Sequence, residues 1–288
     1  MAEWEREFET DPAEIRRAAG SPTAWRLLGT GWDCDAWLAD ETVVWRVPRR
    51  TIAIEPLRRE ATLMPLLAPH LPLPVPVARL VDCALPALAR HDLVAGSELA
   101  QQPGDWHVGE AIGRFLKALH VPKLVNLVSG VIPHDPLDRS DPARRIVVAH
   151  QLLDRVAHRI EIAALRAIVE EGRGPRLELD VVTHGDLHPR HVLVDGGGAV
   201  SGVIDWGDSC IGSRAVDLAL VTALSAEERT AFFRAYGEVE PRMWRHARLI
   251  GVHLAAALLA SEAEPSREQA WLGWLERLVR QPYVHAGS

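Results

Sequence analysis

The feature that most constrains the fold is the stretch 183–208, in which a polar segment is followed by two short apolar runs. The runs 192–194 and 200–204 have the length and β-branched content of strands, and a run of glycines separates them. This pattern predicts a β-hairpin, with Asp186 before its first strand and Asp205 after its second. The two carboxylates are therefore predicted to meet at one end of a two-stranded ribbon.

Two carboxylates that meet at one point indicate a particular chemistry. A hard divalent cation such as Mg²⁺ takes oxygen ligands. Phosphoryl transfer needs one group that accepts the proton of the incoming hydroxyl, and further ligands for the metal that bridges the phosphates. Asp186 and Asp205 are candidates for these two roles.

The polar residues of this stretch form two motifs. The first is His184-x-Asp186-x4-His191, and the second is Ile204-Asp205-Trp206. Together they resemble the aminoglycoside phosphotransferase (APH) family of small-molecule kinases, which is similar in fold to the protein kinases. The resemblance implies that Asp186 is the catalytic base and that His191 and Asp205 hold Mg²⁺. It also implies that His184 and Asp217 provide structural support for the catalytic loop.

His191 departs from the family pattern, which mostly has a metal-binding Asn at this position. This His resembles the variant found in the macrolide phosphotransferases of the same superfamily. The departure leaves the acceptor substrate open, because the overall motif favours an aminoglycoside and His191 favours a macrolide.

A glycine-containing turn is expected near the N-terminus. The apolar segments 25–28 and 36–38 flank Gly29 and Gly31, which predicts two short strands and a turn. In a kinase-like fold the backbone N–H groups of this turn cover the phosphates of a nucleotide. A plain hairpin turn is the alternative, since the third glycine of the kinase pattern is missing.

Arg46 and Glu60 are the next candidates for nucleotide binding. The resembled fold has a Lys on this strand that pairs with a Glu on the following helix. The only lysines of this chain, Lys117 and Lys123, lie far downstream, so Arg46 is expected to bind the phosphates and Glu60 to hold it. A strand-edge Arg and a solvated helical Glu are the alternative.

The segment 87–94 predicts a strand that leads into a linker between two lobes. In the resembled family the purine base binds at this connection. The resemblance therefore makes His91, Asp92, Leu93 and Val94 candidate nucleotide contacts.

Apolar spacing and capping residues predict two helices before residue 97, over 11–19 and 55–67. After residue 97 most of the chain is predicted to be helical, over 108–120, 141–171, 213–224, 241–260 and 266–281, with a further helix beginning at a capping box, 225–228. Five prolines between residues 65 and 76 predict an extended loop there. The expected fold class is α+β, a protein-kinase-like bilobal fold. Residues 1–96 form a small β-rich nucleotide-binding lobe, and 97–288 form a larger, mostly helical lobe with the catalytic hairpin and the acceptor pocket.

Composition and net charge limit the classes of binding partner and the cellular compartment that we expect. A net charge of −7 argues against non-specific nucleic-acid binding. Three widely spaced cysteines indicate reduced thiols, and the acidic N-terminus does not resemble a secretory signal. The longest strongly apolar run, 249–260, is too short to cross a bilayer. We therefore expect a cytoplasmic protein, a monomer or weak homodimer, without nucleic-acid or membrane partners.

The resulting hypothesis is a kinase that transfers the γ-phosphate of ATP or GTP, with Mg²⁺, to a hydroxyl of a small molecule. An antibiotic, either an aminoglycoside or a macrolide, is the first expected acceptor, and a choline-, homoserine- or sugar-type metabolite is the alternative. A metal-dependent phosphohydrolase on the three histidines near Asp186 and a non-catalytic nucleotide-binding module are further alternatives. Two sets of side chains are candidates for the acceptor pocket: the acids Asp154, Glu161, Glu227, Glu228, Glu262 and Glu264, and the tryptophans Trp244, Trp271 and Trp274.

Overall fold

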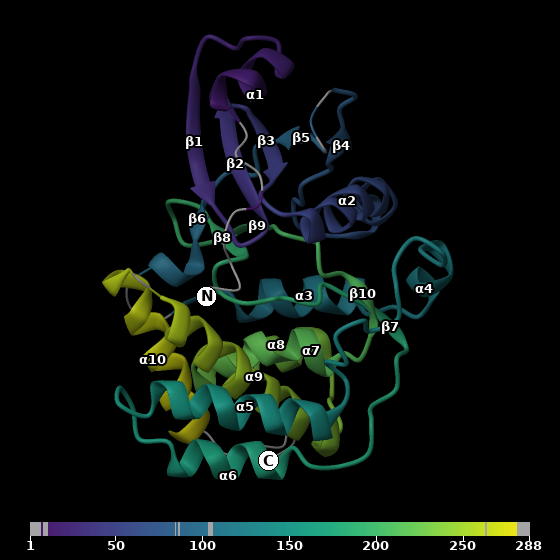
Figure 1. The fold of residues 1–288 in the computed structure, drawn as a ribbon. Coiled ribbons are helices and arrows are strands. Elements are labelled where there is room, and N and C mark those ends of the chain that lie inside the picture. Colours follow the sequence, from purple (N-terminus) through teal and green to yellow (C-terminus); the bar gives the residue numbers. More distant parts are fainter. Residues whose placement is uncertain are drawn as a thin grey trace.

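The computed structural model describes residues 7, 11–83, 85, 87–102, 106–262 and 264–280. Figure 1 shows a small lobe built around a sheet above a larger lobe built of helices. This is the two-lobed α+β architecture that the sequence predicts. Within the described residues, no helix combines the length and the apolar character that crossing a membrane requires.

The small lobe contains a five-stranded antiparallel sheet in the order β1-β2-β3-β5-β4. Its strands are β1 (Trp25–Thr30), β2 (Cys34–Ala39), β3 (Val43–Pro48), β4 (Arg79–Leu80) and β5 (Ala89–Asp92). On one face, Trp45 and Val47 of β3 pack with Ile15 of α1 (Pro12–Ala18), a helix capped by Asp11. Because side chains alternate along a strand, Arg46 points to the opposite face.

Helix α2 (Ile54–Leu67) covers the face of the sheet to which Arg46 points. Leu57 packs with buried residues of β2 and β5, whereas Leu63, Met64 and Leu67 belong to the core of the large lobe. The expected extended loop is wrong for residues 65–70, since α2 continues through Pro65 to Leu67, as the predicted helix 55–67 requires, and a 3-10 helix follows over Ala68–His70; the loop begins at residue 71. Pro65 removes only one hydrogen bond in the last turn, and the fully buried side chains of that turn offset the loss.

The large lobe is helical, with two small antiparallel sheets next to the small lobe. Its helices are α3 (Gly109–Leu119), α4 (Lys123–Leu127), α5 (Pro142–Val156), α6 (Ala163–Glu171), α7 (Ala215–Leu218), α8 (Ala226–Tyr236), α9 (Pro241–Ser261) and α10 (Pro265–Arg280). Its strands are β6 (Ser97–Glu98), β7 (Val181–Thr183), β8 (Val192–Val194), β9 (Val200–Val203) and β10 (Cys210–Gly212). Helix α9 lies among α5, α6 and α10 (Figure 1).

The prediction of one helix over 141–171 is wrong. Asp141 caps α5 as expected, but this helix ends at Val156. A second helix, α6, begins at Ala163, whose N–H donates a hydrogen bond to the Glu161 carboxylate. In the intervening segment, Arg159 donates to the carbonyl of Leu259 on α9. The break lets both helices pack against α9, an arrangement that local periodicity does not reveal. The predicted helix 213–224 is likewise divided into α7 and a 3-10 helix over Ala219–Ala223.

The capping box at the start of α8 forms only in part. Ser225 Oγ accepts from the N–H of Glu228, as predicted. The carboxylate of Glu228 does not return this bond; it accepts instead from the N–H of Gly109 at 2.7 Å, at the start of α3. The acid therefore joins two helices rather than capping one.

Candidate active site

The predicted hairpin is present and carries a sharply bent loop before its first strand. The polar loop connects β7 to β8, and β8 pairs with β9. Gly185 has φ +88°, and a Cβ there would lie 2.3 Å from the carbonyl oxygen of Asp208, so only glycine fits. Asp205 has φ +67°, the left-handed region that non-glycine residues rarely adopt, and such strained positions cluster at functional sites.

His184 and Asp217 hold the backbone of this loop. His184 Nε2 contacts the carbonyl oxygen of Ile204 at 2.9 Å, which ties the loop to the strand that precedes Asp205. Asp217 accepts hydrogen bonds from the N–H groups of His184 and Gly185, at 2.9 and 3.0 Å. Both side chains are fully buried. These contacts are of the supporting kind that the resemblance implies.

His120 completes this supporting network, and the sequence analysis missed it. Its Nε2 lies 3.0 Å from Asp217 Oδ2, and its Nδ1 lies 2.8 Å from the hydroxyl of Tyr236. His120 follows α3 and Tyr236 ends α8, so the contact depends on how two distant helices pack. No local pattern marks His120 as part of the site.

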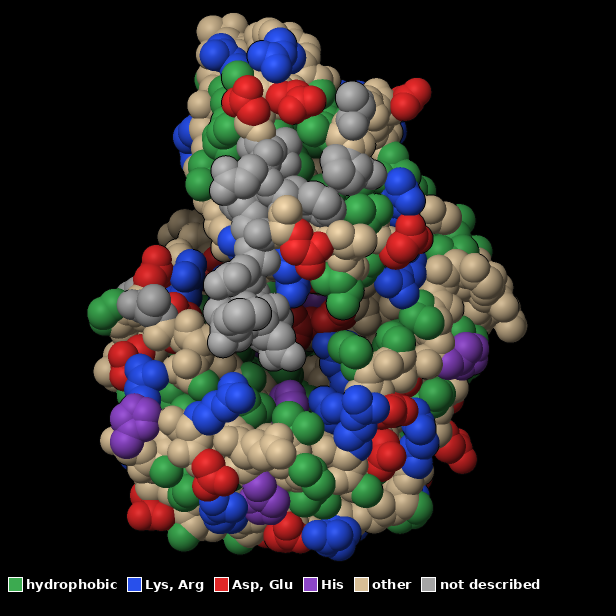
Figure 2. Space-filling view, viewed as in Figure 1, with side chains coloured by type: hydrophobic (Ala, Val, Ile, Leu, Met, Phe, Trp, Pro, Cys, Tyr) green, Lys and Arg blue, Asp and Glu red, His purple; other side chains and the backbone are tan. Residues whose placement is uncertain are grey.

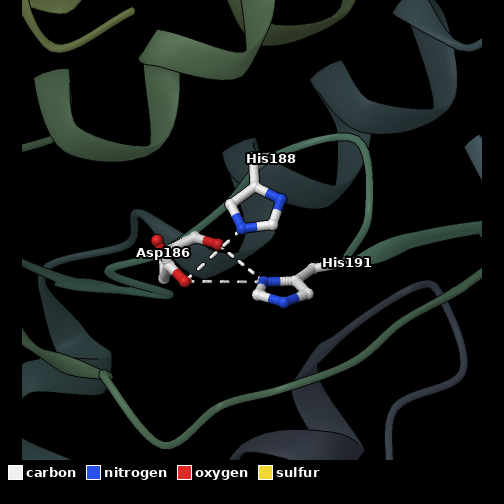
Figure 3. A group of neighbouring side chains, drawn as sticks. All are labelled: Asp186, His188 and His191. Atoms are coloured by element: carbon white, nitrogen blue, oxygen red, sulfur yellow. Dashed lines mark hydrogen bonds and ion pairs between the residues drawn. The ribbon is translucent and has the colours of Figure 1, made fainter. Parts of the chain in front are cut away.

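Asp186, His188 and His191 lie together in the loop (Figure 3). His188 Nε2 is 3.5 Å from Asp186 Oδ2, and His191 Nδ1 is 2.9 Å from the carbonyl oxygen of Asp186. The two imidazole rings are 3.9 Å apart between centroids. His188 is buried.

The hydrogen bonds assign different tautomers to the two rings. His188 Nδ1 accepts from the N–H of Arg190, so its proton is on Nε2, which faces the Asp186 carboxylate. His191 Nδ1 donates to the Asp186 carbonyl, so its lone pair is on Nε2. His188 is therefore arranged as a hydrogen-bond donor to Asp186, and His191 as a candidate metal ligand.

Asp205 lies between His191 and Arg46. Its Oδ2 is 3.4 Å from His191 Nε2, and its Oδ1 is 3.1 Å from Arg46 Nη2. The lone pair of His191 Nε2 thus faces a carboxylate oxygen of Asp205. A cation bound between the two atoms would remove their mutual repulsion. The donors fit a divalent metal ion, although Mg²⁺ prefers oxygen to nitrogen ligands.

Arg46 and Glu60 form the ion pair that the sequence analysis expected. Arg46 Nη1 lies 2.5 Å from Glu60 Oε2, across the space between β3 and α2. Glu60 is completely buried, and its Oε1 has no hydrogen-bond partner among the described residues. The alternative of a solvated helical Glu is wrong.

Burial and charge set the protonation of the two central acids. Burial raises the pKa of Asp186, but His188, which donates a hydrogen bond to its carboxylate, and the neighbouring His191 and Arg139 outweigh this effect and hold the pKa well below its ordinary value. Burial, followed by the proximity of His191, lowers the pKa of His188 to about 4. At neutral pH Asp186 is therefore a carboxylate beside a neutral His188. Partial burial also raises the pKa of Asp205, and Arg46 and His191 reverse that effect.

The other predicted nucleotide contacts lie at two places in the small lobe. Gly29 is in β1, and the N–H of Gly31 donates to the carbonyl of Cys34 at 2.9 Å, which closes the expected turn. The segment from His91 to Val94 runs from the end of β5 toward β6. Two of its backbone groups are occupied, since His91 Nδ1 contacts the Asp92 carbonyl and the N–H of Leu93 donates to Thr42.

A cavity of about 350 Å³ lies beside this segment. Its lining includes Asp92, Leu93 and Val94, together with Pro74, Val75, Val77, Ala95 and Ser201. None of the phosphate- or metal-binding candidates lines it. The cavity is therefore separate from the Asp186 centre.

The candidate acceptor groups are placed less favourably. Trp244, Trp271 and Trp274 are buried in the core of the large lobe, where Trp271 packs edge-on against His188. Asp154 and Glu264 pair with Arg166 and Arg267. Glu161 and Glu228 accept backbone hydrogen bonds, as described above, and Glu262 accepts one from the indole of Trp271.

Comparison with known proteins identifies the family of the chain. The model of the "Phosphotransferase enzyme family" (APH) matches residues 24–250. Among curated proteins, the uncharacterized protein YcbJ of Bacillus subtilis (strain 168) is 37% identical over 62 residues, which is 21% of this chain and 20% of that protein. The chain thus matches about a fifth of the length of this relative.

Several solved structures share the fold. A GDP and kanamycin complex of APH(2")-IIia has a TM-score of 0.68 and 18% identity, covering 93% of this chain and 96% of that one. Macrolide 2'-phosphotransferase MphH from Brachybacterium faecium, as apoenzyme, has a TM-score of 0.61 and 24% identity, covering 92% and 98%. A streptomycin-ATP-APH(2")-IIa ternary complex has a TM-score of 0.56 and 16% identity, covering 95% and 98%.

These matches confirm the family and the kinase-like fold that the two motifs indicate. The family model covers both the Arg46–Glu60 pair and the whole catalytic hairpin. The chain belongs to the phosphotransferase enzyme family.

Proposed function

We propose that the protein transfers the γ-phosphoryl group of a purine nucleoside triphosphate to a hydroxyl of a small molecule, with Asp186 as the base. One observation carries the proposal: the side chains of Glu60, Arg46, Asp205 and His191 form an unbroken series of polar contacts that ends beside Asp186. A cation for the phosphates, ligands for a metal and a half-buried carboxylate thus occur in one place. Phosphoryl transfer requires this combination.

Each side chain has a distinct part in the proposed reaction. Asp186 accepts the proton of the acceptor hydroxyl, and His188, through its Nε2–H, holds that carboxylate in position. Arg46 binds the phosphates, and Glu60 holds the Arg46 side chain in place beside α2. His191 and Asp205 would hold Mg²⁺, which when bound neutralises charge on the phosphates. Catalysis then depends mainly on positioning and electrostatic stabilisation.

The nucleotide donor is supported by the solved structures of the same fold, whose names include GDP and ATP. The segment from His91 to Val94 is the proposed contact for the base, and the turn with Gly29 and Gly31 the proposed cover for the phosphates. The division of the lobes near residue 96 stays a prediction. Strand pairing supports it, because β6 pairs with β8 of the large lobe and not with the first sheet.

The acceptor is proposed to be a small hydroxylated molecule. Kanamycin and streptomycin in the names of two similar structures, and the macrolide enzyme MphH, support an antibiotic. A metabolite remains the second candidate, because the acids and tryptophans expected to recognise an antibiotic are largely engaged elsewhere. The cytoplasmic location and the monomeric or weakly dimeric state also stay predictions.

A nucleotide-turnover assay with Mg²⁺ tests the proposal. ATP and GTP are offered with panels of aminoglycosides, macrolides, amino alcohols, sugars and hydroxy acids. Acceptor-stimulated turnover is expected, and Asp186→Ala should reduce it by about 10²- to 10⁴-fold without weakening nucleotide binding. Asp154→Ala is the matched control, since Asp154 is an exposed acid paired with Arg166, and it should be neutral.

The other outcomes separate the alternatives. Near-normal turnover by Asp186→Ala would refute its role as base. Release of phosphate from phosphate esters without any nucleotide would favour a metal-dependent phosphohydrolase. Tight nucleotide binding without turnover under every condition would favour a binding module.

A further inference from the structure

Arg139 brings a positive charge to Asp186 from the large lobe. Its backbone is held by Asp135, whose carboxylate accepts from the N–H groups of Arg139 and Ser140, both at 2.8 Å. Its Nη2 donates to Asp208 Oδ2 at 2.7 Å. Burial lowers the pKa of Arg139, but the charges of Asp208 and Asp186 outweigh it and raise the pKa. Asp208 lies against Gly185, the residue before Asp186, so its bond to Arg139 holds this guanidinium beside the proposed base.

One side of the Arg139 guanidinium has no partner. Its Nη1 is buried and forms no hydrogen bond within the described part of the chain. A buried donor without a partner is unfavourable, and arginine can bind two carboxylate or phosphate oxygens through its two edges. Asp208 occupies one edge, so the other is available to a bound anion.

Arg145 adds a second positive charge beside the first. It lies in the first part of α5, half-buried, and donates through Nη2 to the carbonyl of Leu137 at 3.2 Å. Across the ranges that the structure describes, no carboxylate pairs with it. Burial, followed by the positive charges of Arg139 and Arg144, lowers its pKa. The bond to Leu137, two residues before Arg139, keeps Arg145 near Arg139, and Asp135 and Asp138 act on Arg145 in the opposite direction without forming an ion pair with it among the described residues.

His253 of α9 lies within the influence of Arg139 and Arg145 and carries no negative charge that could offset theirs. Its Nδ1 is buried and lacks a hydrogen-bond partner among the residues described. Burial, followed by the charges of Arg145 and Arg139, lowers its pKa to about 3, and only Asp186 acts in the opposite direction. His253 is therefore neutral at physiological pH, and the positive charges that act on it are those of Arg139 and Arg145.

The visible surface agrees with this charge distribution. Figure 2 shows blue Lys and Arg side chains gathered below the hollow between the lobes, with red side chains deeper inside. The acids once expected to attract a polycation are largely held by other partners, Asp154 by Arg166 and Glu264 by Arg267. Outside the loop itself, the charge recorded as acting on Asp186 is the positive charge of Arg139.

We propose that the acceptor is a hydroxy compound that carries an anionic group, a carboxylate or a phosphate, which Arg139 and Arg145 bind while its hydroxyl faces Asp186. This inference rests on the proposed kinase function. It names the substrate class of that site and disfavours the polycationic aminoglycosides, which the two arginines would repel. It leaves the nucleotide side of the cleft, with Arg46 and Glu60, unchanged.

Binding and turnover are measured on the full chain with matched pairs of compounds. Glycerate is compared with glycerol, gluconate and glucose 6-phosphate with glucose, and kanamycin serves as the polycation. Calorimetry with the nucleotide site saturated by a non-hydrolysable ATP or GTP analogue gives binding, and a coupled assay with ATP or GTP gives kcat and KM. The anionic member of at least one pair should bind at least about tenfold more tightly than its neutral partner, as expected for a charge-assisted hydrogen bond.

Arg145→Gln tests whether Arg145 is responsible for the tighter binding of the anionic compound. It should raise the KM or Kd of the anionic compound by about 10- to 100-fold, with kcat and nucleotide affinity changed less than threefold. Arg144→Gln is the control, because Arg144 is an exposed neighbour that pairs with Asp138. It should leave all constants unchanged.

Two results would overturn the inference. One is that neutral compounds or kanamycin bind at least as well as every anionic compound. The other is that Arg145→Gln behaves like Arg144→Gln. Failure of the kinase function itself is distinguishable, since the wild-type protein would then bind the anionic compound but no nucleotide, or would bind both without transfer.

Discussion

Replacement of Arg46 by Met tests whether the Arg46–Glu60 pair is held as a buried ion pair. The two charged groups are 2.5 Å apart, and the exposed fractions of their side chains are 14% and 0%. Met keeps much of the length of Arg but carries no charge. The variant therefore leaves the Glu60 carboxylate buried without its cation, and we expect it to lose about 3–5 kcal/mol of unfolding free energy.

The pH dependence of this loss provides a second, independent check. Burial raises the pKa of Glu60 above its ordinary value of 4.5, and the charge of Arg46 opposes that rise. Without Arg46 the pKa of Glu60 in the folded state rises further. An acid with a raised folded-state pKa stabilises the fold below its unfolded-state pKa, and this contribution is lost as pH rises through the folded-state value. The destabilisation should thus be larger at pH 8 than at pH 5.

Urea denaturation followed by circular dichroism, at pH 5 and pH 8, measures both effects. The double variant Arg46→Met/Glu60→Gln is the control, because it removes the buried charge together with its partner. It should be more stable than Arg46→Met at pH 8 and should show less pH dependence. A loss below about 1 kcal/mol in Arg46→Met, equal at both pH values, would refute the assignment of a buried carboxylate.

Three further changes test the catalytic loop. Gly185→Ala should cost at least about 3 kcal/mol or prevent folding, because its φ is +88° and the new Cβ would lie 2.3 Å from the carbonyl of Asp208. Urea denaturation checks this against Gly196→Ala, which has open space around it and should change stability by less than about 0.5 kcal/mol. His188→Ala should lower kcat about 10- to 100-fold in steady-state kinetics, with little change in KM for the nucleotide. His188→Gln keeps a hydrogen-bond donor and should recover part of the lost kcat. A wild-type kcat in the Ala variant would contradict the positioning role. His191→Asn should be the most tolerated change at the proposed metal site, since it restores the commoner family residue, and complete inactivity at saturating Mg²⁺ would argue against a metal-binding role.

Much of the local architecture could be predicted from the sequence. The hairpin follows from two β-branched runs around consecutive glycines, and the caps at Asp11 and Asp141 are present as expected. Such features depend on neighbouring residues, whose spacing is visible in the chain. The pairing of Arg46 with Glu60 was expected from the resemblance, and the structure places the two groups in contact.

Features that join distant segments of the chain could not be predicted from the sequence. The division of 141–171 into α5 and α6 follows from packing against α9, and the role of Pro65 depends on what the last turn of α2 buries. The contacts of His120 with Asp217 and of Arg139 with Asp208 join residues far apart in the chain. No motif marks these partners, because each contact exists only after the helices have packed.

The sequence alone determined which chemical groups are available and which of them share one hairpin. Asp186, His191 and Asp205 are close in the chain, so turn chemistry is enough to bring them together. The tertiary structure decided how these groups are protonated, oriented and surrounded. The net charge of the chain is −7, yet the positive charge of Arg139 acts on the proposed base. Coulomb interactions depend on distance through space and on burial, and only the folded chain defines either.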